Sequence, residues 1–204
     1  MTLSRRLFLA SLAAAAAAAA TPALADDVPA PDLSQEPFPV KDDERKVEYK
    51  YRRKQMAYNT SEAPGTIVVD PKARFLYFVL GNGEAIRYGA SVGKQGRTWS
   101  GQATIGRMEK WPTWTPTPEH IAEFPKLVKY VPGGMPGGPE NPMGARALYL
   151  YQGDVDTIYR IHGTYDPSMI GRKKTAGCVS LLNVDIIDLY NRVQLGTKVV
   201  VLEY

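Results

Sequence analysis

Short runs of β-branched and aromatic residues recur along residues 65–204 and predict a mainly β fold. Turn residues bound these runs: Pro71 follows the first, and Gly81-Asn82-Gly83 is typical of a tight hairpin connection. The predicted strands cover residues 66–70, 74–80, 85–92, 147–151, 157–161 and 198–203. Their number and shortness favour a sandwich or a barrel.

One segment after these strands has the hydrophobic period of an amphipathic helix. Asn183 is the predicted N-cap, Asp185 falls in the first turn, and Gly196 ends the segment. The expected apolar face consists of Ile186, Ile187, Tyr190 and Val193. The chain is therefore expected to combine many strands with one good helix.

A long stretch rich in proline and glycine separates two groups of strands. It contains Trp111 and Trp114 near its start and the Gly/Pro cluster of residues 132–139 near its end. Loops of this length inside a compact domain are usually functional or disordered. The tryptophans favour a structured lid or cleft wall over a loop that merely packs on the surface.

The first 25 residues have the anatomy of a secretory signal peptide. Arg5-Arg6 precedes an alanine-rich apolar run, and Ala23-Leu24-Ala25 provides the small residues of a cleavage site. The segment also resembles a twin-arginine export signal. An uncleaved membrane anchor is the alternative, but the run is short for a span. We expect a mature periplasmic protein that begins near Asp26 and has no stable membrane span.

Residues 26–63 contain four prolines, a mixed-charge run and few aliphatic residues, which predicts an extended N-terminal arm with little core of its own. The basic stretch Tyr49–Lys54 is read as part of a solvated linker. Contact between that stretch and an anionic envelope polymer is the alternative.

Composition narrows the class of protein. With 44% hydrophobic and 23% charged residues, the chain is neither disordered throughout nor collagen-like, coiled-coil or polytopic. The formal net charge is +4, of which Arg5 and Arg6 in the leader supply two, so nucleic acid is not an expected partner. A single cysteine and two histidines do not furnish a convincing zinc site, and no metal or other cofactor is expected.

The candidate chemistry lies between residues 161 and 178. His162 ends a predicted strand and is followed by Gly163, while the single cysteine, Cys178, is preceded by Gly177. A thiol becomes nucleophilic when a base removes its proton, and imidazole is the usual base. A packed cysteine beside a hydrogen-bonded histidine remains the alternative.

These residues resemble the catalytic motif of the L,D-transpeptidases, which remodel peptidoglycan. The matching positions are His162-Gly163-Thr164, Thr175-Ala176-Gly177-Cys178 and Asn183. The resemblance covers about residues 66–202, and it includes the strand Ile67–Asp70 and the segment 141–149. It implies an L,D-transpeptidase-like β-sandwich over residues 64–204, with one helix after the cysteine and the long Pro/Gly-rich loop.

The resemblance also implies roles for individual residues. Cys178 would attack a stem-peptide carbonyl. His162 would take the thiol proton, or the two residues would already form a thiolate–imidazolium ion pair, and the Gly163 carbonyl would orient the imidazole. Oxyanion and loop-support roles would fall to Gly177, Thr175 and Ala176. The candidate substrate-binding residues are Thr164, Tyr149, Arg160, Arg172, Trp114 and Asn183. The expected partners are peptidoglycan stem peptides, with another stem peptide or an envelope or outer-membrane protein as acceptor.

Two other functions stay open at this point. A carboxypeptidase or endopeptidase on the same fold would use water as acceptor, and a peptidoglycan-binding domain would not catalyse at all. Ser180 stands where the resembled motif usually has arginine. We interpret this departure as altered substrate preference rather than altered packing, because Arg172, Lys173 and Lys174 offer other cations for a substrate carboxylate.

Overall fold

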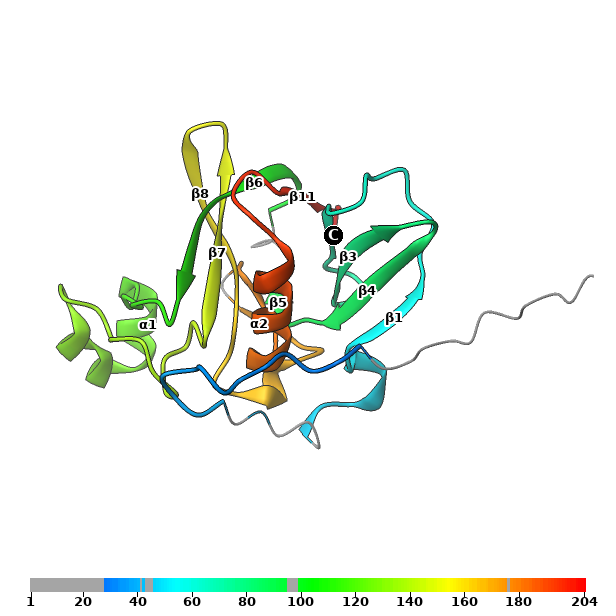
Figure 1. Ribbon diagram of the computed structural model, residues 1–204. Helices are drawn as coiled ribbons and strands as arrows, with labels where there is room; N and C mark the ends of the chain where they lie inside the picture. Colours follow the sequence, from blue (N-terminus) through cyan, green and yellow to red (C-terminus); the bar gives the residue numbers. More distant parts are fainter. Residues whose placement is uncertain (1–27, 41, 43–45, 95–98, 176) are drawn as a thin grey trace, which may run out of the picture.

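A computed structural model describes residues 28–204, apart from residues 41, 43–45, 95–98 and 176 (Figure 1). The predicted signal peptide and Ala176 therefore lie outside the described residues. Across the described ranges, no helix has both the length and the apolar character needed to cross a membrane.

A single large sheet dominates the described chain. Its strand order is β1-β4-β3-β2-β11-β6-β7-β8-β10. The strands are β1 (Lys54–Ala57), β2 (Ile67–Asp70), β3 (Phe75–Gly81), β4 (Glu84–Gly89), β6 (Gly101–Lys110), β7 (Arg146–Gln152), β8 (Val155–His162), β10 (Val179–Ser180) and β11 (Lys198–Val201). The short strands β5 (Val92–Gly93) and β9 (Lys173–Thr175) pair separately in parallel.

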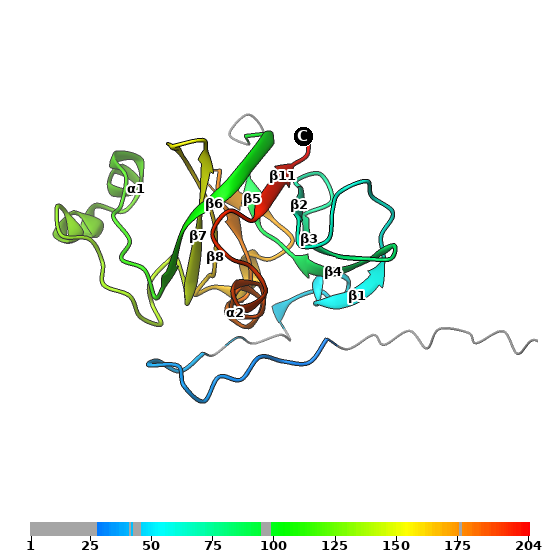
Figure 2. The same ribbon diagram turned by 45° about the horizontal axis from the view of Figure 1, so that its top comes forward.

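The sheet bends so that its two halves form two layers. Figures 1 and 2 show β6, β7 and β8 on one side, β1, β3 and β4 on the other, and helix α2 (Asn183–Arg192) beside the space between them. The mainly β fold with few helices is confirmed, and the two layers of the expected sandwich belong to one continuous sheet. Alternate strand residues fill the core, among them Ile67, Leu76, Ile86, Ile105, Leu148 and Ile161, which pack with Ile186 and Leu189 of α2.

The hairpin between β3 and β4 forms as predicted. Asn82 and Gly83 both have positive φ, 52° and 76°, which is the signature of the two-residue turn that matches strand twist.

The helix after the cysteine is shorter than predicted. Its N-cap is Leu182 rather than Asn183, and it ends at Arg192 rather than near Gly196. Within the long loop the structure adds α1 (Pro118–Glu123) and the 3₁₀ helix η3 (Pro125–Tyr130). Thr117 caps α1, because its side chain accepts a hydrogen bond from the His120 amide. The loop is thus a structured lobe, which Figure 1 shows projecting to one side.

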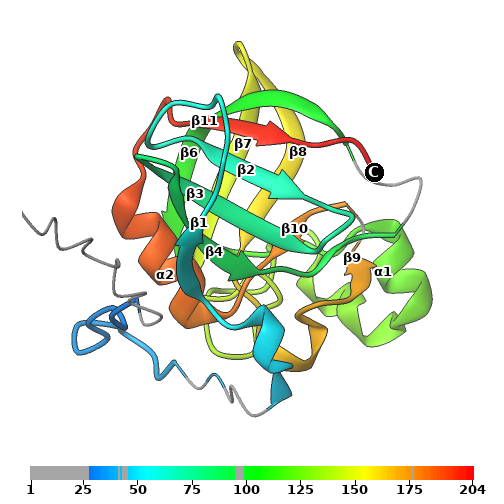
Figure 3. The ribbon, with the colours of Figure 1, turned by 90° about the vertical axis from the view of Figure 1, so that its right-hand side faces the viewer.

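The expectation that residues 26–63 contribute little to the core is wrong for residues 47–57. Strand β1 pairs with β4 at the edge of the sheet (Figure 3). Before it, the 3₁₀ helix η2 (Tyr49–Tyr51) places Tyr51 in the interior with only 1% of its surface exposed. Val47, Tyr51, Ile170 and Leu182 form a second hydrophobic cluster. The sequence lacks helical or strand periodicity here, so this burial could not be predicted from pattern.

The preceding residues are also anchored to the domain. Glu36 forms a buried ion pair with Arg146, and the same carboxylate accepts a hydrogen bond of 2.8 Å from Trp111 Nε1. Asp42 accepts a bond of 2.6 Å from the Val184 amide at the start of α2. A carboxylate in the first turn of a helix satisfies an otherwise unpaired N–H and is favoured by the helix dipole.

We predict that Tyr51→Ala lowers the free energy of unfolding by about 3–5 kcal/mol, the range for deleting a buried aromatic ring. The matched control is Tyr49→Ala, because Tyr49 lies in the same turn and is 80% exposed. That control should change stability by less than about 0.5 kcal/mol. Urea denaturation of both variants measures these free energies of unfolding. An equally small loss of stability in both variants would show that the N-terminal segment does not pack on the domain in solution.

Candidate active site

The pairing of β8 and β10 brings the two halves of the sequence motif together. The strands are parallel, with Val179 opposite Ile161 and Ser180 opposite His162. Since side chains alternate along a strand, Val179 and Ile161 face the core, while His162 and Ser180 share the other face. Cys178 immediately precedes β10, and its thiol reaches the backbone N–H of Arg160 on β8.

The His162 ring is held in a defined orientation and tautomer. Its Nδ1 lies 2.6 Å from the carbonyl oxygen of Gly163, so Nδ1–H is the donor and Nε2 keeps its lone pair. The Ser180 hydroxyl lies 3.3 Å from Nε2, which makes it a hydrogen-bond donor to that nitrogen. Gly163 thus makes the contact that the sequence interpretation assigned to it, and Ser180 lies beside the candidate base.

Burial favours the neutral forms of the histidine and the cysteine. The pKa of His162 is lowered to about 4, mainly by desolvation and further by the charge of Arg160. The hydrogen bond to Gly163 acts in the opposite direction and raises it. Desolvation raises the pKa of Cys178, although the hydrogen bond from the Arg160 N–H lowers it in part. Both shifts favour a thiol and a neutral imidazole over a preformed ion pair.

A hydroxyl shapes the loop before the cysteine. Thr175 Oγ1 donates a bond of 2.5 Å to the Cys178 carbonyl and accepts one of 3.3 Å from the Gly177 amide. Gly177 has φ of 141°, a conformation that favours glycine. The Gly177 N–H must leave Thr175 before it can face a substrate oxygen, and Ala176 lies outside the described residues.

Asn183 is a structural clamp rather than an exposed substrate contact. Its Oδ1 accepts a bond of 2.8 Å from the Ala145 amide, and its Nδ2 donates one of 2.8 Å to the Thr164 carbonyl. A Cβ at Gly144 or Gly163 would collide with this side chain. The amide is buried and committed to the backbone, which also explains why it does not cap α2.

A charged cluster lies on the sheet face that carries His162. The ring of Tyr149 is contacted by the guanidinium groups of Arg107 and Arg160, at 4.6 and 4.4 Å from its centroid, and its hydroxyl donates to Glu109 at 2.5 Å. Burial first, and then the bond to Glu109, raises the pKa of Tyr149. Arg160 is also fixed by a bidentate pair with Asp156.

This cluster borders an open hollow of about 620 Å³. Its lining residues come from β6, β7 and the start of the long loop: Arg107, Met108, Glu109, Lys110, Trp111, Pro112, Thr113 and Tyr149. Arg107 and Glu109 were not predicted. A prediction of strand β6 from the sequence would have placed them on the same face of the sheet as Tyr149. Arg107 and Glu109 are two residues apart, and they lie opposite Tyr149 and Ala147 on β7.

Three other predicted substrate contacts are engaged elsewhere in this structure. Thr164 bonds with Asp166 through its hydroxyl, and Arg172 donates from Nε to the Ser168 carbonyl. Trp114 pairs with the Met135 backbone in the projecting lobe, and its ring meets His120 edge-on. Among the described residues, no three side chains of His, Cys, Asp or Glu form a group that could hold a metal ion.

The comparisons with known proteins identify the family. Residues 64–201 match YkuD, the L,D-transpeptidase catalytic domain. The chain is 33% identical over 143 residues to "Probable L,D-transpeptidase ErfK/SrfK" of Escherichia coli, and 34% identical over 139 residues to "Probable L,D-transpeptidase YbiS" of the same organism. These alignments cover 68% and 66% of this chain. The chain belongs to the L,D-transpeptidase catalytic domain family.

A solved structure supports the fold. The crystal structure titled "Probable carnitine operon oxidoreductase caia" from Brucella melitensis is 48% identical, with a TM-score of 0.52, over 78% of this chain and 99% of that one. The curated relatives are longer proteins, since the alignments cover only 44% and 43% of their lengths.

We predict that Ser180→Arg destabilises the protein, because Ser180 is only 4% exposed and its hydroxyl lies beside His162, so a much larger side chain must displace its neighbours. Overpacking alone costs about 1–3 kcal/mol. Burial of Ser180 favours the packing account over an altered substrate preference, and this variant tests the packing account. Ser180→Ala is the small control and should keep the melting temperature. An unchanged melting temperature in Ser180→Arg would contradict this account.

We also predict that His162 makes stability depend on pH. Its pKa rises from about 4 in the folded state to about 6.5 on unfolding, so the unfolded chain binds more protons between these values. The free energy of unfolding should therefore fall as pH falls from 6.5 to 4. His162→Gln cannot titrate, so the difference in stability between wild type and variant should shrink over this interval. Parallel pH curves for the two proteins would contradict the assignment.

Proposed function

We propose that the protein is a periplasmic peptidoglycan L,D-transpeptidase with Cys178 as nucleophile and His162 as base. The observation that carries the proposal is the joint geometry of β8 and β10. Cys178 immediately precedes the strand that pairs with the end of β8, where His162 lies. The imidazole Nδ1 is bound to the Gly163 carbonyl, which leaves Nε2 as the basic nitrogen, and in this structure Nε2 accepts from the Ser180 hydroxyl. Family membership supports the same chemistry.

In the first half-reaction, the Cys178 sulfur attacks a stem-peptide carbonyl as Nε2 of His162 takes the thiol proton. The tetrahedral intermediate then expels the terminal D-amino acid, whose amine receives that proton, and a thioester remains. Because burial favours the neutral forms of Cys178 and His162, we expect proton transfer to accompany attack rather than to precede it. The Ser180 hydroxyl must turn away from Nε2 when the proton arrives.

In the second half-reaction, an amine attacks the thioester and loses a proton to His162, and the cysteine leaves as the thiol. The acceptor is another stem peptide or an amine of an envelope protein. Backbone N–H groups at Gly177 and Cys178 would stabilise the oxyanion in both halves. The hollow lined by Arg107, Glu109 and Tyr149 offers charges of both signs for a zwitterionic peptide end.

We predict that incubation with muropeptides carrying tetrapeptide stems adds to the protein the mass of the muropeptide without its terminal residue. Intact-mass spectrometry measures this adduct, and hydroxylamine should remove it, because it is a thioester. Cys178→Ala should keep its fold and form no adduct, at a cost in stability of about 1 kcal/mol or less. A mass gain in Cys178→Ala would overturn the nucleophile assignment, and unfolding of that variant would favour a packed cysteine.

The same incubation separates transpeptidase from hydrolase. With an amine acceptor present, a transpeptidase yields the cross-linked or amine-exchanged product, whereas a carboxypeptidase releases the tripeptide stem. Hydrolysed product alone, at saturating acceptor, would support the hydrolase. A binding domain would retain muropeptide without releasing any D-amino acid.

A further inference from the structure

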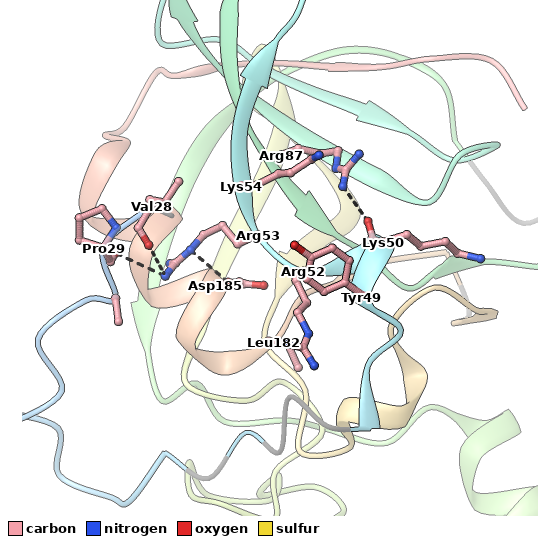
Figure 4. Close-up of a pocket in the computed structure, with 11 residues that line it drawn as sticks. Val28, Pro29, Tyr49, Lys50, Arg52, Arg53, Lys54, Arg87, Leu182 and Asp185 are labelled. Carbon is pink, nitrogen blue, oxygen red and sulfur yellow. Dashed lines mark hydrogen bonds and ion pairs between the residues drawn. The ribbon is translucent and has the colours of Figure 1, made fainter. Parts of the chain in front are cut away.

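A second cavity, of about 480 Å³, lies where the N-terminal segment meets β4 and the start of α2 (Figure 4). Its size is within the range of small-molecule sites. Basic side chains dominate its lining, which comprises Val28, Pro29, Ala30, Tyr49, Lys50, Arg52, Arg53, Lys54, Arg87, Leu182 and Asp185. None of the residues in the proposed reaction lines it.

Some of this positive charge is already neutralised. Arg53 pairs with Asp185 and Asp188 at 3.6 and 3.5 Å, and Lys50 pairs with Glu48 at 2.8 Å. Lys54 and Arg87 differ, because no carboxylate of the described residues forms an ion pair with either of them. Within the described part of the chain, Arg53 and Lys50 are thus paired with carboxylates, and Lys54 and Arg87 are not.

The uncompensated cations are placed directly against each other. Lys54 on β1 is the register partner of Arg87 on β4 in an antiparallel pair. Like charges at such positions destabilise a sheet. Figure 4 shows the two side chains at one end of the pocket, with Arg53 turned toward Val28 and Asp185.

Arg87 is held in place without being neutralised. Its Nη2 donates to the Lys50 carbonyl at 2.7 Å, and its guanidinium lies 4.1 Å from the centroid of the Phe75 ring. Its Nε is buried without a hydrogen-bond partner. Desolvation lowers the pKa of Arg87, so the charge is costly where it stands. A fixed, half-buried cation beside a second cation is the arrangement expected of an anion site.

We propose that this pocket binds a phosphomonoester, with Lys54 and Arg87 as its principal contacts. A phosphomonoester carries a charge of about −1.5 to −2 at neutral pH and would neutralise both cations, whereas a carboxylate would neutralise one. The remaining volume accommodates the group that bears the phosphate. The site is separate from the cysteine chemistry, so its test needs no measurement of turnover.

The test is calorimetric titration of the full chain with glycerol 3-phosphate at pH 7.5, with acetate at equal ionic strength as the comparison anion. Lys54→Gln combined with Arg87→Gln should weaken the Kd at least tenfold. Lys54→Arg should retain binding, and Lys72→Gln, which removes an exposed charge in the turn after β2, should match wild type. Lys54→Gln alone should also raise the melting temperature without ligand, because it relieves the repulsion.

Two vesicle arms identify the source of the phosphate. Phosphatidylcholine vesicles containing phosphatidic acid present a phosphomonoester on a membrane, and those containing phosphatidylglycerol present a diester with one charge. Binding to phosphatidic acid that exceeds binding to glycerol 3-phosphate assigns the site to a lipid headgroup, and the reverse assigns it to a soluble ligand. The proposal would be overturned by equal Kd values for wild type and the double variant, or by acetate binding as tightly as glycerol 3-phosphate. It would also be overturned if both lipids bound and did so equally.

Discussion

The candidate site depends on the amide of Asn183, which joins three segments that are distant in the sequence. It accepts from the backbone before β7, donates to the backbone after β8, and belongs itself to the first turn of α2. A buried amide with both ends satisfied contributes more than a surface hydrogen bond, because breaking one partner leaves the other desolvated and unpaired. This clamp fixes Gly163 close to Ala145, and Gly163 in turn orients His162. No larger residue fits at Gly144 or Gly163 without displacing it.

Support from outside the family domain reaches the same loop. Tyr51 packs on Gly171, where the positive φ of 78° and the proximity of the ring both require glycine. Ile170 joins Tyr51, Val47 and Leu182 in one hydrophobic cluster. Four residues after Gly171, Thr175 begins the turn that presents Cys178. The segment before residue 64 therefore stabilises the loop that precedes the candidate nucleophile, although it carries none of the family motif.

The sequence predicted the elements whose residues alternate in polarity or repeat with the helical period. Strands β2, β3, β7, β8 and β11 and the hairpin at Asn82-Gly83 follow from such patterns. Strand β6 was missed although it is the longest, because Ala103 and Ile105 are its only fully buried hydrophobic residues and its other positions are polar. The burial of Tyr51 was missed for a similar reason. The residues that flank Tyr51 are charged, and its ring is buried by contacts with residues distant in the sequence, such as Gly171.

The motif located His162, Gly163, Thr175 and Cys178 in one place. It could not predict the charge states of the His162 imidazole and the Cys178 thiol. Charge state depends on desolvation, which is a property of the assembled sheet rather than of residue spacing. Ser180 illustrates the difference. In the sequence, Ser180 is only a position where the family usually has arginine. In the structure, it is a buried residue whose hydroxyl faces Nε2 of His162. A buried guanidinium at this position would further disfavour imidazolium and would favour thiolate. A neutral serine exerts no such effect, so in the proposed reaction the departure from the motif would act on the energetics of proton transfer between Cys178 and His162.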